Sequence, residues 1–451
     1  MIHYLKSTIP LIDLAKFWMS LLCWLFCFPV LLTPNIVSSK FHDIALILFL
    51  LLLCFVFLRL KKQSVAIIIA LLLISWLMIE DLPAWQHFKE TSDYVLIFAC
   101  LIPTLTLVRS TAMTMPSVQK TQNRIGALRS KSSASGIQIT SHALGGIINV
   151  GTFALVAVAL PRDADIERRY IAGMATLRGM NSAILWSPFF LSFAVASVYL
   201  PEGFAPGAIS LGVLNAVIFF LITQKITIPN YRIFSILQSI SPLKPIFARL
   251  VVVISSVILT SALFELTALN AVCVVMPILC ALQFLRRPEK IKEIWSNFAS
   301  FQKNGGDEIA IISLSMFIAS QLGQTDEITA LLGHYFGSEP GIRLILFSLP
   351  FLVWAGSVLG IHPVVSSAPL LAFFAPNLGI YDAAFVAQAH MIGWSTGTMT
   401  SFASLSTIIA SENFKIRPTQ ISFGQNFMIA ALLAIGGGLL LGLLHSIFSI
   451  F

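Results

Sequence analysis

The sequence predicts an all-helical, polytopic membrane protein with about eleven transmembrane helices and two re-entrant hairpins in an inverted repeat. The first reason is composition: of 451 residues, 57% are hydrophobic and only 11% are charged, and the mean hydropathy is +0.89. An ordinary soluble domain is about 25% charged. The second reason is a series of long apolar runs, and the third is an uneven distribution of Lys and Arg between the loops. This composition excludes a soluble enzyme.

Long apolar windows place the spanning helices, because about 20 apolar residues are needed to cross a bilayer. Two further apolar stretches, 135–160 and 341–378, are interrupted by Gly, Pro, Ser and His. A lipid-facing helix does not tolerate such interruptions without internal partners, so these stretches are predicted to be the re-entrant hairpins. The expected spans are 17–33, 43–59, 64–80, 93–109, 168–199, 205–223, 245–264, 267–285, 308–322, 381–410 and 419–446.

The basic residues predict the orientation, because Lys and Arg collect on the cytoplasmic side of short loops. With the N-terminus inside and both hairpins returning to the face they entered, twenty-four of the 28 basic residues are cytoplasmic. Only Lys40, Lys89 and Arg343 are external, and Arg178 is left inside the membrane. The net charge of +8 is therefore mainly a topology signal, and no nucleic-acid partner is expected. We place the chain in the bacterial inner (cytoplasmic) membrane, with a cytoplasmic N-terminus and an external C-terminus.

The order of elements recurs in two segments of opposite orientation, 93–224 and 308–451. Each has a span, an amphipathic stretch, a hairpin, a broken span and a plain span, while 1–92 and 225–307 are predicted to be scaffold helices with a cytoplasmic loop. The two amphipathic stretches are 117–132 and 325–336. His142 lies 37 residues before Gly179, and His362 lies 35 residues before Gly397. Inverted repeats with interrupted helices indicate a secondary transporter with its site near the midplane.

The first repeat places small and polar residues at the hairpin tip and in the broken span. Glycine permits tight turns and exposes backbone groups to a ligand, although a Gly-rich turn also serves helix packing. Unwound backbone in the span, around Gly179, would expose a helix C-terminus suited to a cation and an N-terminus suited to an anion. The candidate binding residues here are Gly145, Gly146, Asn149, Gly151, Thr152, Arg178, Gly179, Asn181 and Ser182.

Arg178 has two interpretations. A charge inside the membrane is costly and is a functional hypothesis by default, so Arg178 could attract an anionic substrate. Alternatively, its side chain could snorkel to the cytoplasmic interface, because Arg168 and Arg169 lie only a few turns away.

The second repeat places hydroxyls and imidazoles at the corresponding positions, with the break expected around Gly397. Hydroxyls in a membrane helix also bond to carbonyls of their own helix, so each one has a structural alternative. His362 and His390 could carry a proton, although a lone histidine is also often a hydrogen-bonded structural residue. No metal site, cofactor or catalytic pair is expected, and the coupling ion would be Na⁺ or H⁺. The candidate binding residues here are His362, Ser366, Ser367, Ser395, Thr396, Gly397, Thr398 and Thr400.

The first hairpin also carries a resemblance to a known family. Ala143-Leu144-Gly145-Gly146, followed by Gly151-Thr152, resembles the Asn-x-Gly-Gly and Gly-Thr pattern of the ion transporter superfamily, with Ala143 in place of the Asn. The stretch 309–332 is similar to the corresponding family segment, whereas neither hairpin tip has the Ser-Asn-Thr motif of the sodium-coupled dicarboxylate branch. That superfamily includes divalent anion:sodium symporters, citrate carriers and the large membrane subunits of tripartite dicarboxylate transporters. The resemblance implies that each hairpin tip and its broken helix hold a sodium ion, and that a mobile domain carries the substrate across as an elevator.

These observations predict a secondary active transporter, not an enzyme, that moves a small anionic solute by an elevator mechanism driven by a cation gradient. Its expected partners are the small-molecule anion and the lipid bilayer, with a homodimer as one expected assembly. The alternatives are an exporter or flippase of a lipid-linked or drug-like anion and, from a different class, a membrane-embedded transferase or a scaffold subunit.

Overall fold

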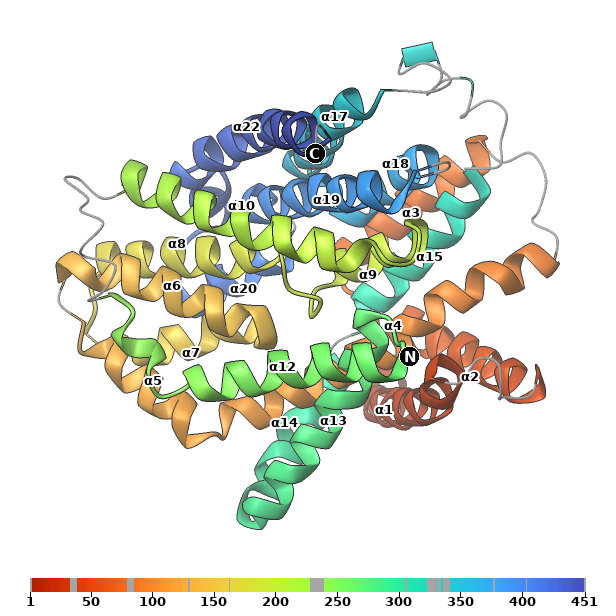
Figure 1. Ribbon diagram of the computed structural model, residues 1–451. Coiled ribbons are helices and arrows are strands. Elements are labelled where there is room, and N and C mark those ends of the chain that lie inside the picture. Colours follow the sequence, from red (N-terminus) through yellow and green to blue (C-terminus); the bar gives the residue numbers. More distant parts are fainter. Residues whose placement is uncertain are drawn as a thin grey trace. The chain divides into compact units, whose positions relative to one another are not determined.

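The fold is helical throughout the part of the chain that the structure, a computed structural model, describes (Figure 1). No strand occurs among those residues, as the composition predicts. The amphipathic stretch expected at 325–336 lies largely outside them. The structure describes residues 2–449 apart from 33–38, 79–84, 129, 162, 228–238, 305, 323–329, 331–333, 336–340, 376–377 and 403.

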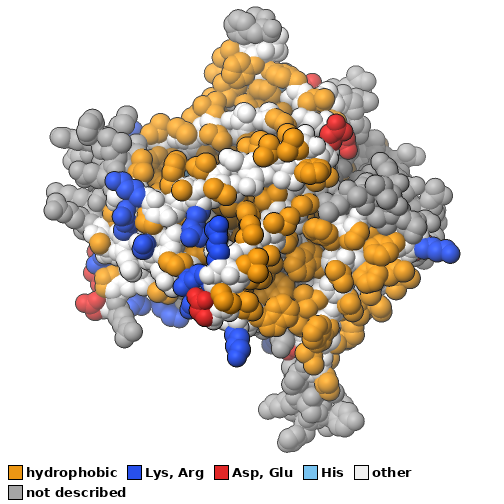
Figure 2. Space-filling view, turned by 60° about the horizontal axis from the view of Figure 1, so that its bottom comes forward, with side chains coloured by type: hydrophobic (Ala, Val, Ile, Leu, Met, Phe, Trp, Pro, Cys, Tyr) orange, Lys and Arg blue, Asp and Glu red, His pale blue; other side chains and the backbone are white. Residues whose placement is uncertain are grey.

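Seven helices in the described ranges are long and apolar enough to cross a membrane. Large apolar side chains also remain exposed on them, as Val217 on one and Leu439 on another illustrate. Figure 2 shows hydrophobic side chains covering much of the described surface in that view. Both features are those of a helical membrane protein. The seven helices contain the windows Leu11–Val30, Lys40–Phe57, Val95–Met113, Phe204–Thr227, Phe247–Phe264, Ala268–Arg286 and Gln425–Phe448.

The chain divides into two compact units and crosses between them three times. Unit 1 comprises residues Met1–Thr114 and Val253–Glu327, and unit 2 comprises Met115–Val252 and Ile328–Phe451. Helix α12 (Phe247–Phe264) contains one of the boundaries.

Unit 1 contains the N-terminal helices and the middle of the chain. Helix α4 packs against α1, α13, α14 and α15, so it forms the centre of this unit. An ion pair of 2.8 Å between Arg59 Nε and Asp13 Oδ1 ties the residues after α2 to α1. The helices are α1 (Ile2–Leu32), α2 (Ser39–Phe57), α3 (Lys62–Met78), α4 (Trp85–Met113), α13 (Ala268–Arg286), η2 (Pro288–Lys290), α14 (Ile291–Asn304) and α15 (Asp307–Leu322).

Unit 2 contains both predicted hairpins and both predicted broken spans. The amphipathic helix α5 (Pro116–Gly126) precedes the first hairpin, and it buries Val118, Thr121 and Ile125 on one face. The remaining helices are α6 (Ser130–Ile148), α7 (Gly151–Ala159), α8 (Ile166–Ala183), α9 (Leu191–Tyr199), α10 (Phe204–Thr227), η1 (Ser241–Leu243), α17 (Ile342–Val358), α18 (Pro363–Phe374), α19 (Ile380–Thr400), α20 (Leu405–Phe414), α21 (Pro418–Ser422) and α22 (Gln425–Phe448).

The two halves of unit 2 have parallel arrangements of helices. In the first half, the pair α6 and α7 packs against α8, and in the second half the pair α17 and α18 packs against α19. The two halves also pack against each other, because α7 contacts α20 and α18 contacts α9. Each half therefore places the second arm of its hairpin beside the short helix that follows the break in the other half.

Both hairpins turn at a residue with left-handed backbone geometry. Asn149 has a φ of 50° between α6 and α7, a region that Asn tolerates better than most residues. Gly360 has a φ of 89° between α17 and α18, where the absence of a Cβ makes the turn possible. The Gly, Asn and Pro residues in these apolar stretches thus mark turns. Each stretch consists of two helices that are joined by a turn.

The breaks in the two spans lie later than the sequence predicts. Helix α8 continues through Gly179 and ends at Ala183, and α19 continues through Gly397 and ends at Thr400. The first break is residues 184–190, and the second is residues 401–404. Pro188 accounts for the first position, because it has no N–H and disfavours helical geometry in the preceding residue. Gly179 and Gly397 instead lie within intact helices.

Candidate functional site

Glycines set the distance between each hairpin and its broken helix. A Cβ on Gly179 would collide with the carbonyl oxygen of Gln138 and come within 2.8 Å of Ser141 Cβ, so α6 and α8 approach at this point. A Cβ on Gly397 would collide with the Ser357 hydroxyl, so α17 and α19 approach there. Both glycines that the sequence analysis assigned to unwound backbone therefore permit close helix packing, as small residues do in membranes.

The last turns of α8 and α19 are joined by direct hydrogen bonds between polar side chains and the backbone. The Ser395 hydroxyl donates to the carbonyl oxygen of Asn181 at 2.8 Å. The Thr398 hydroxyl lies 2.7 Å from Asn181 Oδ1 and 2.8 Å from the carbonyl of Trp394. All three candidate residues are more than nine-tenths buried. We refer to Asn181, Ser395 and Thr398 as the helix-end cluster.

The electrostatics of the helix-end cluster favour a cation. Both α8 and α19 present their C-terminal ends here, and the unsatisfied carbonyls of a helix C-terminus carry partial negative charge. Ser404, the N-cap residue of α20, donates to the carbonyl of Thr398 at 2.7 Å and so holds the second break against α19. The cluster combines carbonyl, amide and hydroxyl oxygens, which are the groups that replace water around a desolvated cation.

His142 on α6 connects the first hairpin to the first break. The indole N–H of Trp186 donates to His142 Nε2 at 3.1 Å, and His142 Nδ1 lies 2.9 Å from the Ser182 hydroxyl. Since an indole can only donate, Nε2 is the acceptor, and a neutral imidazole must then carry its proton on Nδ1. The Ser182 hydroxyl in turn donates to the carbonyl of Gly179 at 2.7 Å. The candidate Ser182 thus takes part in a chain of bonds from the break back to α8.

The first hairpin tip also lies close to the break. A Cβ on Gly145 would come within 2.9 Å of Met180 Cα, and one on Gly146 within 3.0 Å of the Trp186 ring. Ser187, within the break, donates its hydroxyl hydrogen to the carbonyl of Gly146 at 2.5 Å. Gly151 and Thr152 are buried at the start of α7, and the Thr152 hydroxyl has no hydrogen-bond partner among the described residues.

The second hairpin tip lies beside Trp394 of α19. His362 caps the N-terminus of α18, where its Nδ1 accepts from the backbone N–H of Val364 at 3.3 Å. Its ring centroid is 5.8 Å from that of Trp394, and the ring of His390 is 5.5 Å from the same indole. His390 Nε2 donates to the carbonyl of Ser192 at 3.0 Å. Trp394 therefore lies against both histidines that the sequence analysis considered for proton coupling.

Not every predicted hydroxyl reaches beyond its own element. Thr396 donates to the carbonyl of Ile392 at 2.7 Å, and Thr400 donates to that of Thr396 at 3.0 Å. Ser366 donates to the carbonyl of Pro363 at 3.2 Å, while the buried hydroxyl of Ser367 has no partner in the described part of the chain. Thr396, Thr400 and Ser366 thus bond to carbonyls of their own helices, whereas Ser395 and Thr398 reach Asn181 of α8.

The Arg178 side chain is directed away from the first break. Its Nε donates to the carbonyl of Met174 at 3.1 Å, so the guanidinium lies over the preceding turn of α8. This is the direction that snorkelling requires, but the protein buries the side chain, which is only 3% exposed. Arg178 is thus a buried cation close to, but not within, the helix-end cluster.

Several polar residues of the site have partners that are remote in sequence and were not singled out from it. The Gln388 amide nitrogen of α19, in the orientation that satisfies its partners, donates to the carbonyl of Leu185 in the first break at 3.0 Å. In the same orientation its oxygen accepts from Asn215 Nδ2 of α10 at 3.3 Å. Gln388 and Trp186 resemble any other buried residues in the sequence, and only the approach of distant helices gives them a role.

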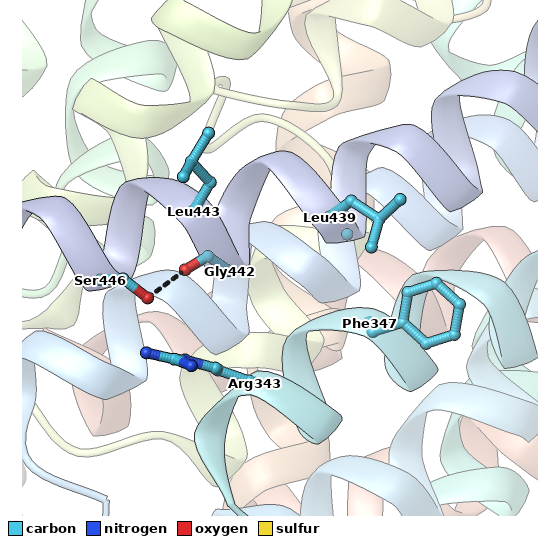
Figure 3. Close-up of a pocket in the computed structure, with 7 residues that line it drawn as sticks. Arg343, Phe347, Leu439, Gly442, Leu443 and Ser446 are labelled. Carbon is cyan, nitrogen blue, oxygen red and sulfur yellow. Dashed lines mark hydrogen bonds between the residues drawn. The ribbon is translucent and has the colours of Figure 1, made fainter.

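A surface pocket between α17 and α22 lies apart from these residues (Figure 3). Its polar side chains are those of Arg343 and Ser446, and Ser446 bonds to the carbonyl of Gly442 in its own helix at 2.8 Å. None of the predicted site residues lines it. The lining residues are Arg343, Phe347, Gly438, Leu439, Gly442, Leu443 and Ser446.

The chain matches no protein-family model and no curated protein sequence.

If the helix-end cluster binds a cation, Thr398→Val is expected to weaken that binding by about tenfold or more. The change keeps the shape of the side chain but leaves the buried Asn181 Oδ1 without its donor, which costs about 1–3 kcal/mol. The measurement is the cation concentration that gives half of the maximal rise in the thermal unfolding temperature of the purified protein. Thr176→Val is the matched control, because the Thr176 hydroxyl is equally buried and bonds only to the carbonyl of Ala172 in its own helix. Equal effects of the two changes would show that the helix-end cluster is ordinary packing.

Proposed function

We propose that the protein is a secondary active transporter that moves a small anionic solute by an elevator mechanism coupled to a Na⁺ or H⁺ gradient. The observation that carries the proposal is the helix-end cluster, where two broken helices from the two halves of unit 2 meet at their C-terminal ends. Discontinuous helices of this kind are where secondary transporters bind coupling ions and substrates. The resemblance of the first hairpin to the ion transporter superfamily supports the same proposal.

The division into two compact units also supports an elevator mechanism. Unit 2 contains both hairpins, both breaks and all the candidate site residues, whereas unit 1 is formed by the N-terminal and middle helices. In an elevator one body carries the whole site while another remains fixed, so a site confined to one unit is what this mechanism requires.

Uptake by the purified protein in proteoliposomes tests the proposal. Anions would first be screened by the shift in thermal unfolding temperature that each causes, with and without sodium and at two pH values. The anion with the largest shift would then be followed as a radiolabelled solute under an imposed Na⁺ or H⁺ gradient. We expect uptake that requires one of the two gradients and accumulates solute above its external concentration. Absence of uptake for every anion that stabilises the protein would contradict the proposal.

A further inference from the structure

Among the buried polar side chains of unit 2 that have atoms without a hydrogen-bond partner in the described structure, three lie on α8 or in the segment 414–426. They are Arg178 on α8, Ser422 at the end of α21 and Asn426 in the first turn of α22. The atoms are Arg178 Nη1, the Ser422 hydroxyl, and both the nitrogen and the oxygen of the Asn426 amide. Ser422 and Asn426 are fully buried, and Arg178 is nearly so.

Contacts between the first half of α8 and the 414–424 segment place the stretch that carries Ser422 beside the turns of α8 toward which the Arg178 side chain extends. A Cβ on Gly173 would come within 2.8 Å of Ile416 Cδ1, and one on Gly424 within 2.8 Å of the Tyr170 hydroxyl. Gly424 lies between Ser422 and Asn426 in the chain. The Arg178 side chain extends toward the preceding turns of α8 and bonds to the carbonyl of Met174, next to Gly173. The guanidinium therefore lies over the part of α8 against which the segment that carries Ser422 packs.

The chemistry of the three groups is that of a carboxylate site. A buried charge without a partner costs several kcal/mol, and no Asp or Glu of the described residues forms an ion pair with Arg178. A guanidinium presents two parallel N–H groups that match a carboxylate, while a hydroxyl and an amide nitrogen supply further donors. With only one cation among them, these groups neutralise one negative charge.

We infer that Arg178, Ser422 and Asn426 form the binding site for the carboxylate of a singly charged organic anion. The inference rests on the proposed transport function and names the substrate class: a monocarboxylate rather than a dicarboxylate. A second carboxylate would lose its water without a second cation to replace it, which is unfavourable in a buried site.

Binding of propionate and succinate to the purified full-length protein tests the inference. Propionate should bind to the wild type at least tenfold more tightly than succinate, as measured by calorimetric titration with sodium present. Asn426→Ala should weaken propionate binding about tenfold, because a hydrogen bond to a charged group is lost. Ser422→Ala should weaken it less. Asn413→Ala and Ser197→Ala are matched controls, since both residues bond within their own helices, and they should leave binding unchanged.

Asn426→Asp provides a second and independent readout. The new side chain has almost the same shape but places a carboxylate beside Arg178, so it should raise the thermal unfolding temperature and abolish propionate binding. If Asn426 instead has a purely structural role, Asn426→Asp should lower the thermal unfolding temperature, because a buried Asp without a cationic partner lowers stability. Wild-type propionate affinity in Asn426→Asp would overturn the inference.

The outcomes separate this inference from the proposed function. If Arg178→Gln abolishes propionate binding while the Ser422 and Asn426 variants bind normally, the anion lies elsewhere around Arg178 and only the inference fails. Tighter binding of succinate than of propionate overturns the substrate class while the transport proposal stands. If neither carboxylate binds and no other anion is transported, both fail.

Discussion

Replacing Arg178 with glutamine is expected to reduce anion uptake into proteoliposomes more than tenfold, while the thermal unfolding temperature stays close to that of the wild type. Glutamine removes the buried positive charge of unit 2 that could replace water around an anion at this place. It removes few existing bonds, because the structure records only the bond from Nε to the Met174 carbonyl for this side chain. Arg178→Lys keeps the charge but loses the two-pronged donor geometry, so it should retain partial activity.

Arg169→Gln is the control for this prediction. Arg169 lies on the same helix, is only half-buried and donates from Nε to the carbonyl of Ala164 at 2.9 Å. Its replacement should leave uptake within about twofold of wild type. If Arg178 snorkels to the interface instead, Arg178→Lys should leave uptake unchanged and Arg178→Gln should reduce it only slightly. Full activity of Arg178→Gln would remove this residue from the site.

Gly179→Val is expected to cause a large loss of stability, of about 1–3 kcal/mol or more, and a loss of folded protein in the membrane. The new side chain would overlap the Gln138 carbonyl and press against His142, and neither backbone group can move without separating α6 from α8. The measurement is the thermal unfolding temperature in detergent together with the yield of monodisperse protein.

Gly436→Val is the matched control, because it makes the same substitution within the long helix α22 where a Cβ meets nothing within 4 Å. It should unfold within a few degrees of the wild type. If Gly179→Val were equally stable, the close approach of α6 and α8 would not exist in the membrane.

The sequence predicts the helical class because composition and apolar run length are summed over many residues, and the all-helical prediction is confirmed. It also locates the interruptions, because Pro, Gly and Asn act on the backbone where they stand. Asn149 and Gly360 lie at turns for this local reason. The orientation of the loops, the re-entrant entry of the hairpins and the site assignments stay predictions.

The sequence is less informative where a residue acts through a distant partner. The sequence predicts that the helices unwind at Gly179 and Gly397, but both glycines lie where two helices pack closely. A glycine among small and polar residues is typical of both situations, so the local sequence does not distinguish them. The bonds from Trp186 to His142 and from Thr398 to Asn181 join residues 44 and 217 positions apart, so no local pattern could predict them. The same is true of the approach of Gly424 to Tyr170 of α8, two residues far apart in the sequence.

The account depends most directly on the two hairpins opening toward opposite faces of the membrane. Single cysteines at Gly341 and Gly379 would mark the two ends of the second hairpin, where a Cβ meets nothing within 4 Å. Cysteines at the exposed residues Ala127 and Asp163 would mark the ends of the first hairpin. The background would lack the six native cysteines, of which Cys54 is exposed.

The measurement is labelling of intact cells with a membrane-impermeant thiol reagent, with labelling after permeabilisation to show that each cysteine is reactive. The account predicts that cysteines at 341 and 379 both react in intact cells, whereas those at 127 and 163 react only after permeabilisation. If the two ends of either hairpin react from opposite sides, that stretch is a simple span, and the inverted repeat and the transport mechanism built on it are both contradicted.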